Sequence, residues 1–345
     1  PNPARGSDQA AEHPDSDGGP VERNAVSRWP RRLAARTEPQ ETGGAIDPLA
    51  YRTGQQLLGN PSGAAALEIP LGQLSLRLSD TRRVAVTGPP LAVLASGLKQ
   101  SVNTSFVLQA GDVLMLGRLD SGMYCYLSIE GGIDTPPVFD SRSTVVREGL
   151  GGLDGRALKP GDTLPLGDRI PRPCRRTVSR HYSAQDNDQA KTRAELAAAP
   201  PTVTALRFVP GFQFDALPDA ARDTLCNARY RVSARGDRMG IRLEGADLVT
   251  GLSQLWSEGT CLGAIQIPPD GQPIILLHDR QTMGGYPKAG AIIASDCARL
   301  AQLRPGATVQ LAPITLREAD RIRWLTDNYE RERAMDTVDA RPETS

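Results

Sequence analysis

The chain has 345 residues, a length at which we expect two domains of ordinary size. Its 34 glycines and 28 prolines favour turns and argue against a long helical bundle or a coiled coil. Forty basic and forty acidic residues give a formal net charge of zero, which argues against a protein that mainly binds nucleic-acid phosphates or a lipid surface. We therefore expect small molecules and other proteins as partners, with neither nucleic acid nor membrane.

The rarer residue types exclude several kinds of site. The five cysteines and three histidines lack the close pairs of a structural zinc site or a disulfide framework, so we expect no metal. No lysine is preceded by Gly or flanked by Met, which excludes a P-loop nucleotide site and a biotin-bearing lysine. No apolar signal segment or membrane span is visible, so we expect a cytoplasmic protein.

Local signals predict the first elements along the chain. Residues 1–43 are rich in Pro, Gly, Asp and Arg, and we expect them to be disordered or degenerate. The pair Asp47-Pro48 predicts a helix that runs through Leu57 and ends at Gly59. Alternation of apolar and polar residues predicts half-buried strands over 74–78 and 123–129.

The second part of the chain repeats this pattern after a break. Residues 168–202 have the Pro-rich and polar composition of a linker. We then expect strands around 206–209, 230–233, 264–267, 274–277, 291–294 and 308–311, with short helices over 218–227 and 296–303. Helical spacing predicts a charged helix over 316–335 within a C-terminal segment, 316–345. Strands outnumber helices, so we predict a mainly β chain with short helices and two β domains, over 44–167 and 203–315.

A first polar cluster, Asp140-Ser-Arg-Ser-Thr144, interrupts the strands. Its small hydroxyls around Arg142 could bind a carboxylate or a carbonyl through charge-assisted hydrogen bonds. Alternatively, it is a turn in which Asp and Ser bond the backbone while Arg142 is solvated.

A second polar cluster, His278–Lys288, follows an apolar strand and contains two adjacent glycines. Gly284 and Gly285 would let a ligand approach the backbone and leave amides free to stabilise an oxyanion. The alternative is a polar turn with ordinary surface charges. Asp237–Gly240 and Gln266–Pro268 are weaker candidates, because such sequences are more often a turn or a strand edge.

At these clusters the chain resembles the allophanate hydrolase subunit 2 family. This family is also the second part of the carboxyltransferase domain of urea carboxylase, and it includes the C subunit of bacterial 5-oxoprolinase and the Kip-type antagonist. The matching stretches, in the family's order between about residues 43 and 315, are Gly44-Ala-Ile-Asp-Pro48, Gly59-Asn-Pro61, Leu67-Glu-Ile69, Tyr126–Pro136, Ser141-Arg-Ser-Thr144, Gly151–Arg156, Asp237–Leu243, Gly263–Pro268, Asp279–Pro287 and Ala301-Gln-Leu303.

The resemblance implies a fold and a choice of chemistries. The fold would be two tandem cyclophilin-like β-barrel subdomains. The activity would be ATP-dependent opening of 5-oxoproline to glutamate, or transfer of a carboxyl group from carboxybiotin to urea or a similar amide. ATP or carboxybiotin would be supplied in the complex, with no cofactor bound covalently. The implied partners are a subunit 1 homologue (Kip-inhibitor-like) and a LamB-type subunit or a biotin carboxylase with its carrier.

Within this resemblance, roles are assigned by chemical type. Asp279 and Gln281 would position the substrate amide, and Thr282 would help stabilise developing negative charge. Arg142 or Arg238 would hold a carboxylate. The further substrate-binding candidates are Ser141, Ser143, Gln266, Gly284, Gly285, Tyr286 and Lys288.

One departure from the family pattern keeps a non-enzymatic alternative open. Family members begin with a strand bearing Gln-Asp-x-Gly-Arg, whereas Arg31–Gln40 here contains no such motif. The first strand is therefore missing or replaced. A non-catalytic antagonist that binds and sequesters a subunit 1 partner is the alternative function.

Overall fold

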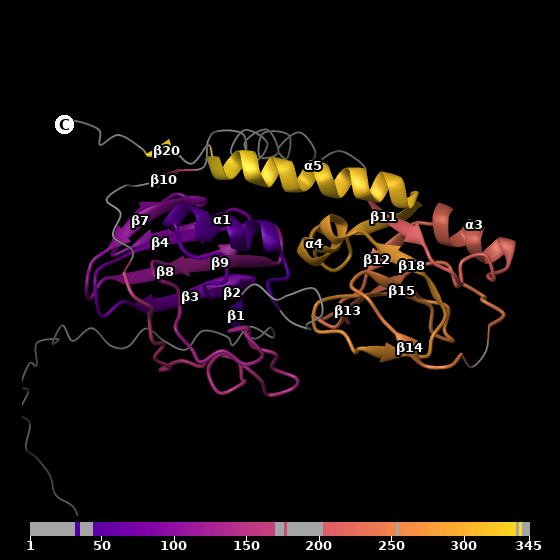
Figure 1. Cartoon of the computed structure of the whole chain (residues 1–345), viewed down its shortest axis with the longest axis horizontal. Helices are drawn as coiled ribbons and strands as arrows, with labels where there is room; N and C mark the ends of the chain where they lie inside the picture. The colour runs from indigo at the N-terminus through magenta and orange to yellow at the C-terminus, as the bar shows by residue number, and fades with distance from the viewer. Residues whose placement is uncertain are drawn as a thin grey trace, which may run out of the picture.

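The strands form two β units that lie side by side (Figure 1). The computed structural model describes residues 32–34, 44–169, 176–177, 203–252, 255–335 and 338–339. Most of the expected N-terminal segment (1–43) and of the expected linker (168–202) lies outside these residues. The prediction of a mainly β chain with short helices is confirmed.

The first unit consists of two sheets and one helix. Its strands are β1 (Arg32–Ala34), β2 (Ala66–Pro70), β3 (Gly72–Arg77), β4 (Arg82–Thr87), β5 (Leu91–Ala95), β6 (Leu98–Gln100), β7 (Thr104–Leu108), β8 (Val113–Leu119), β9 (Tyr124–Ile129), β10 (Arg176–Thr177) and β20 (Val338–Asp339). They form a seven-stranded sheet in the order β1-β2-β9-β4-β7-β10-β20 and a four-stranded sheet in the order β3-β8-β5-β6. The stretch Arg31–Gln40, which lacks the family motif, contains the short strand β1. This strand pairs antiparallel with β2, with Arg32 opposite Glu68.

Helix α1 (Pro48–Leu58) begins at the predicted Pro48, runs one residue beyond the predicted Leu57 and stops at the predicted Gly59. The side chain of Asp47 accepts a hydrogen bond from the Ala50 N–H at 3.1 Å and so caps the first turn. Gly59 ends the helix in the left-handed conformation, with φ of 69°.

The prediction of a half-buried strand is right for β3 and wrong for β9. In β3 the polar side chains are exposed and the leucines are partly buried. In β9 all six residues are buried, because α1 covers the face of the sheet that alternation assigns to solvent. The ring of Tyr51 from α1 packs edge-on against that of Tyr126 in β9.

The second unit is a closed barrel with three helices. The barrel strands are β11 (Thr204–Pro210), β18 (Lys288–Ile292), β15 (Ala264–Gln266), β16 (Ile274–Leu276), β13 (Gly240–Glu244), β12 (Tyr230–Val232) and β19 (Thr308–Pro313), in this order around the barrel. The helices are α3 (Asp219–Asn227), α4 (Ala294–Gln302) and α5 (Leu316–Met335), the last of which runs above both units in the view of Figure 1. A separate ribbon pairs β14 (Glu258–Gly259) with β17 (Met283–Gly284).

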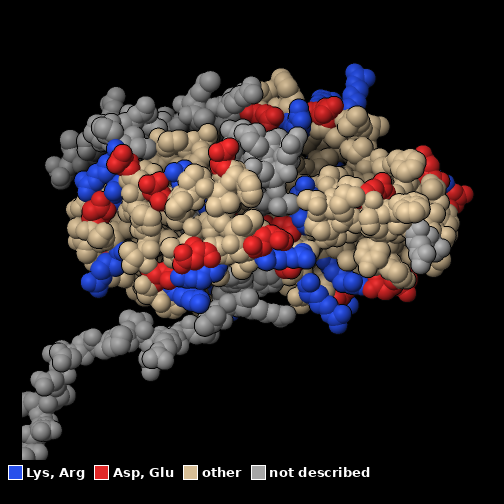
Figure 2. Space-filling model, turned by 60° about the horizontal axis from the view of Figure 1, so that its bottom comes forward, with Lys and Arg blue, Asp and Glu red and all other residues tan. Residues whose placement is uncertain are grey.

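Two further observations concern the surface. Among the described residues, no helix is long and apolar enough to cross a membrane. On the face shown in Figure 2, basic and acidic side chains of the described residues are interspersed, in keeping with the zero net charge.

A buried carboxylate attaches α4 to the barrel. The Asp296 side chain has no exposed surface, and its Oδ1 accepts a hydrogen bond from Nη2 of Arg207 at 2.7 Å. Burial raises the pKa of Asp296, but hydrogen bonds from the Arg207 side chain and backbone outweigh that effect and hold the pKa below its usual value. Asp296 therefore stabilises the fold above the pKa of the unfolded chain, and the contribution declines as the pH falls through the lowered folded pKa.

We expect Asp296→Asn to lower the free energy of unfolding by about 2 kcal/mol near neutral pH, because charge-assisted hydrogen bonds are lost. The difference from wild type should narrow below about pH 4, where the wild-type carboxyl begins to lose its advantage. Urea unfolding at about pH 7 and about pH 3 measures both differences. An equal difference at the two pH values would contradict the role assigned to the charge.

Candidate functional site

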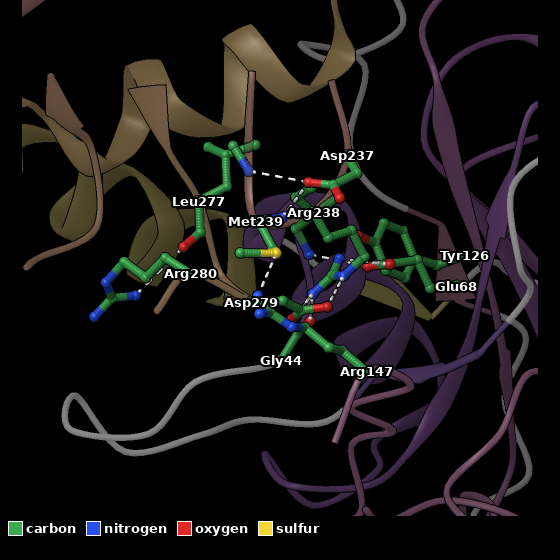
Figure 3. A network of polar contacts seen from close by, with 12 residues as sticks. Gly44, Glu68, Tyr126, Arg147, Asp237, Arg238, Met239, Leu277, Asp279 and Arg280 are labelled. Atoms are coloured by element: carbon green, nitrogen blue, oxygen red, sulfur yellow. Dashed lines mark hydrogen bonds and ion pairs between the residues drawn. The ribbon is translucent and has the colours of Figure 1, made fainter. Parts of the chain in front are cut away.

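Arg238 joins the two units through a buried guanidinium group (Figure 3). Its Nη1 lies 2.7 Å from Oε1 of Glu68 in β2, and its Nη2 donates to the Gly44 carbonyl at 2.7 Å. Within the second unit, its Nε donates to Oδ2 of Asp279 at 3.1 Å. We call Gly44, Glu68, Arg238 and Asp279 the arginine joint. A substrate carboxylate at Arg238 would have to displace Glu68 or Asp279, so the geometry favours a structural role for this arginine.

The turn before β13 presents Arg238 to the joint. Oδ1 of Asp237 accepts hydrogen bonds from the N–H groups of Met239 at 2.8 Å and Gly240 at 3.2 Å. This local bonding closes the turn, as Asp commonly does. The Arg238 carbonyl also accepts from the Asp279 N–H at 2.9 Å, so that backbone and side chain both hold Asp279.

Glu68 is held from the side of the first unit. Its Oε2 accepts hydrogen bonds from the Tyr126 hydroxyl at 2.8 Å and from the Ile46 N–H at 2.9 Å. Burial raises the pKa of Tyr126 well above its usual value, and the charges of Glu68 and Asp47 raise it further. The phenol therefore stays protonated and remains a donor to Glu68.

A second contact between the units lies at the end of α4, and it involves none of the arginine-joint residues. The Gln302 side chain accepts from the Met123 and Tyr124 N–H groups at 2.9 and 3.0 Å, and donates to Oδ2 of Asp47 at 2.8 Å. Arg304 donates to the carbonyls of Gly122 at 3.1 Å and Leu119 at 2.7 Å. We call Gln302 and Arg304 with these partners the helix joint.

Sequence reasoning did not single out Glu68 as a site residue. The available signal was a lone carboxylate in the apolar run Ala66–Pro70, all five residues of which are buried. A charged residue in such a strand needs a partner. That partner, Arg238, lies 170 residues further along the chain.

The Asp279–Lys288 segment crosses from the arginine joint to the ribbon. The Thr260 N–H donates to the Thr282 carbonyl at 2.9 Å, and the Thr260 hydroxyl donates to the Gln281 carbonyl. At its far end the Lys288 N–H donates to Oε1 of Gln213 at 2.7 Å. The segment is therefore tied to its neighbours at its start, middle and end.

Gln266 lies beneath the ribbon with an unused hydrogen-bond donor. The residue is 1% exposed, and its Nε2 has no partner within the part of the chain that the structure describes. A Cβ atom at Gly284 would lie 2.5 Å from this Nε2. A side chain at 284 would therefore need the space that the end of the Gln266 side chain occupies.

An ion pair ties the ribbon to the barrel beside Gln266. Nζ of Lys288 lies 2.9 Å from Oε1 of Glu258, which also accepts from Nε2 of Gln213. Lys288 is opposite Gln266 in the pairing of β15 with β18. We call Gln213, Glu258, Gln266, Gly284 and Lys288 the ribbon cluster.

The predicted site residues of the first unit, Ser141, Arg142 and Ser143, form hydrogen bonds within their own unit. Arg142 donates hydrogen bonds to the Asp134 carboxylate and to the Thr135 carbonyl, both at 2.9 Å. The Ser143 N–H donates to the Ser141 hydroxyl at 3.2 Å. The same loop approaches the second unit through Arg147, whose Nη1 lies 2.6 Å from Sδ of Met239.

The predicted site residues therefore fall into three groups. Asp279 and Arg238 belong to the arginine joint, and Ser141, Arg142 and Ser143 form a separate loop. The ribbon and its surroundings hold the rest, with Thr282 and Tyr286 exposed: Gln266, Gln281, Thr282, Gly284, Gly285, Tyr286 and Lys288. Within the described residues, no group of His, Cys, Asp and Glu could hold a metal ion.

The chain matches a family of carboxyltransferase domains. The family model named carboxyltransferase domain, subdomain A and B, matches residues 41–313, and the chain belongs to this family.

Among its relatives, the chain is 35% identical to the C subunit of 5-oxoprolinase from Escherichia coli over 287 residues, which are 83% of this chain and 87% of that protein. It is 32% identical to the 5-oxoprolinase C subunit of Haemophilus influenzae, over 83% of this chain and 87% of that protein. The structure is similar to urea carboxylase of Kluyveromyces lactis, with a TM-score of 0.76 and 22% identity over 90% of this chain and 29% of that chain. At that identity the likeness shows the fold.

Two glycine substitutions on the ribbon test the geometry around Gln266. Gly284→Ala should displace the Gln266 side chain and shift its side-chain amide resonances in NMR spectra, because the new Cβ needs the same space. The cost in stability should stay near 1 kcal/mol, or about 3 °C in unfolding midpoint, since the end of a flexible side chain can move.

Gly259→Ala is the matched control on the partner strand. A Cβ there meets nothing within 4 Å, so the Gln266 resonances should stay in place. Unchanged Gln266 resonances in Gly284→Ala would show that the two groups are not in contact.

Proposed function

We propose that the chain is a subunit of a multi-subunit enzyme of the 5-oxoprolinase type, which opens 5-oxoproline to glutamate with ATP. The observation that carries the proposal is the likeness to two subunits of that name over 87% of their length, at 35% and 32% identity. In this reaction water adds across the lactam C–N bond, and the carbonyl oxygen gains negative charge during attack.

The ribbon cluster supplies what a lactam carbonyl requires. The Nε2–H of Gln266 is buried beneath Gly284, so the proposal requires the ribbon to move aside before this group donates to the carbonyl oxygen and to the oxyanion that develops from it. The Thr282 hydroxyl and the Gln281 amide would offer further hydrogen bonds, and Gly284 and Gly285 would let the substrate approach the backbone once the Gln266 side chain has moved. In this proposal Lys288 and Tyr286 border the same position.

Arg142, with Ser141 and Ser143 beside it, stays a prediction for the substrate carboxylate, and none of its hydrogen bonds among the described residues goes to the ribbon cluster. Its side chain is 35% exposed and forms an ion pair with Asp134. In this proposal Asp279 positions the Asp279–Lys288 segment and does not contact the substrate, because its carboxylate is paired with Arg238.

The ribbon cluster does not fit a nucleoside triphosphate. Its cation, Lys288, is paired with Glu258, and no anion-binding loop of the P-loop type is present in the sequence. We therefore propose that a partner subunit, and not this chain, binds ATP.

A second candidate, carboxyl transfer to urea or a similar amide, is favoured by the family model and by the fold shared with urea carboxylase. The ureido carbonyl of carboxybiotin and the carbonyl of urea are both acceptors that the Gln266 donor fits. If neither chemistry occurs, the antagonist hypothesis remains, in which the chain only binds a subunit 1 homologue.

Co-purification with candidate partners tests the proposal. The chain is expressed with a subunit 1 homologue and a LamB-type subunit, and we expect ATP-dependent release of glutamate from 5-oxoproline. In this complex Gln266→Ala should lower kcat about 100-fold, the usual loss for an oxyanion donor. Lys99→Ala, at an exposed lysine of β6, is the control and should keep wild-type activity.

The negative outcomes point to different alternatives. A stable complex without glutamate release would overturn the 5-oxoprolinase proposal. Incorporation of labelled bicarbonate into urea in the presence of a biotin carboxylase and its carrier would then support carboxyl transfer. Tight binding of subunit 1 without either activity would support the antagonist.

A further inference from the structure

The arginine joint lies at the first residue of the segment that carries the proposed site. Both carboxylate oxygens of Asp279 face Arg238, at 3.1 Å from Nε and 3.3 Å from Nη2. The same guanidinium also contacts Glu68 and Gly44 in the first unit. The start of the Asp279–Lys288 segment is thus held by Arg238 of its own unit, and Arg238 is in turn bonded to groups of the other unit.

Because the arginine joint is buried, removing any one of its charged side chains deprives another of a partner in a place that water barely reaches. The side chains of Glu68, Arg238 and Asp279 are 1%, 10% and 10% exposed. A charge in such a place is strongly destabilised when its partner is removed. One guanidinium serves two carboxylates, so a change at Glu68 alters the position of Arg238 and, through it, that of Asp279.

We propose that Arg238 is a positioning residue: it sets the geometry of the Asp279–Lys288 segment, and thereby of the ribbon cluster, according to how the first unit is docked. For catalysis this inference rests on the proposed function. The binding surface of the second unit is then complete only when Glu68 and Gly44 of the first unit are in place.

The helix joint distinguishes positioning from simple attachment. Arg304 also spans the units with two hydrogen bonds, yet its partners Gly122 and Leu119 lie outside the Asp279–Lys288 segment. Loss of the Arg304 contacts removes hydrogen bonds between the units but leaves the contacts of Arg238 with Glu68 and Asp279 in place. Arg304→Lys is therefore the matched control for Arg238→Lys.

Hydrogen–deuterium exchange of the full chain provides a readout that does not need activity. Glu68→Gln, which removes the charge and keeps the size, and Arg238→Lys should each speed exchange in peptides covering 279–288 about tenfold. Arg304→Lys should speed exchange around 119–124 and leave 279–288 as in wild type. Glu68→Gln decides the matter if Arg238→Lys fails to fold.

In the assembled complex, Glu68→Gln should lower kcat about tenfold with KM within about twofold, because misplaced groups bind substrate but align it poorly. Arg304→Lys should leave kcat within about twofold at the same temperature. Wild-type exchange at 279–288 in Glu68→Gln, or equal effects of Glu68→Gln and Arg304→Lys there, would overturn the inference. A wild-type complex without activity would count against the proposed function alone, since the exchange experiment still decides how the segment is held.

Discussion

The burial of the Arg238 guanidinium between two carboxylates is the constraint on which the arrangement of the two units depends. Removing three charged groups from water is costly, and the cost is offset only when all of them meet with good geometry. Arg238 and Asp279 pair within the second unit, whereas Glu68 of the first unit meets this guanidinium only when the two units are docked. The hydrogen bonds of Tyr126 and Ile46 to Glu68 complete the arrangement. The joint therefore specifies one docking of the units, which apolar contact by itself would leave less defined.

The elements that were predictable from sequence are those whose signals are local. The helix cap at Asp47, the stop at Gly59 and the helical spacing after Leu316 each involve neighbouring residues, and the structure has helices at these places. Strand β9 shows the limit of such reasoning. Its alternation predicts one exposed face, but α1, which lies more than sixty residues earlier in the chain, covers that face. Periodicity reports on a strand and carries no information about what packs on it from elsewhere.

The same distinction explains what was and was not predictable about the site. The concentration of polar groups at 278–288 and the paired glycines were visible in the sequence, and the structure places Gly284 directly against Gln266. The partners of Asp279 and Arg238 were not visible, because chemical type alone does not tell an arginine that binds substrate from one that binds Glu68 across the chain. Arg142 and the ribbon residues share a chemical character, yet they lie in different units.

The motifs that identify the family therefore contain two kinds of residue. Asp47, Glu68, Arg238 and Gln302 hold the units together, and a chain docked in this way needs them, whether it catalyses a reaction or only binds a partner. They cannot discriminate an enzyme from an antagonist. A residue that could distinguish an enzyme from an antagonist is one that lowers the stability of the fold and makes no compensating contact within it. Under the proposed function Gln266 is such a residue: a buried amide donor without a partner among the described residues costs about 1–3 kcal/mol, and a bound carbonyl would recover it. Ser128 and Thr135, whose hydroxyls are also buried without a partner there, lie outside the proposed site. If the chain only binds a partner, as in the antagonist hypothesis, an apolar residue of similar size at 266 is expected to stabilise it without loss of binding.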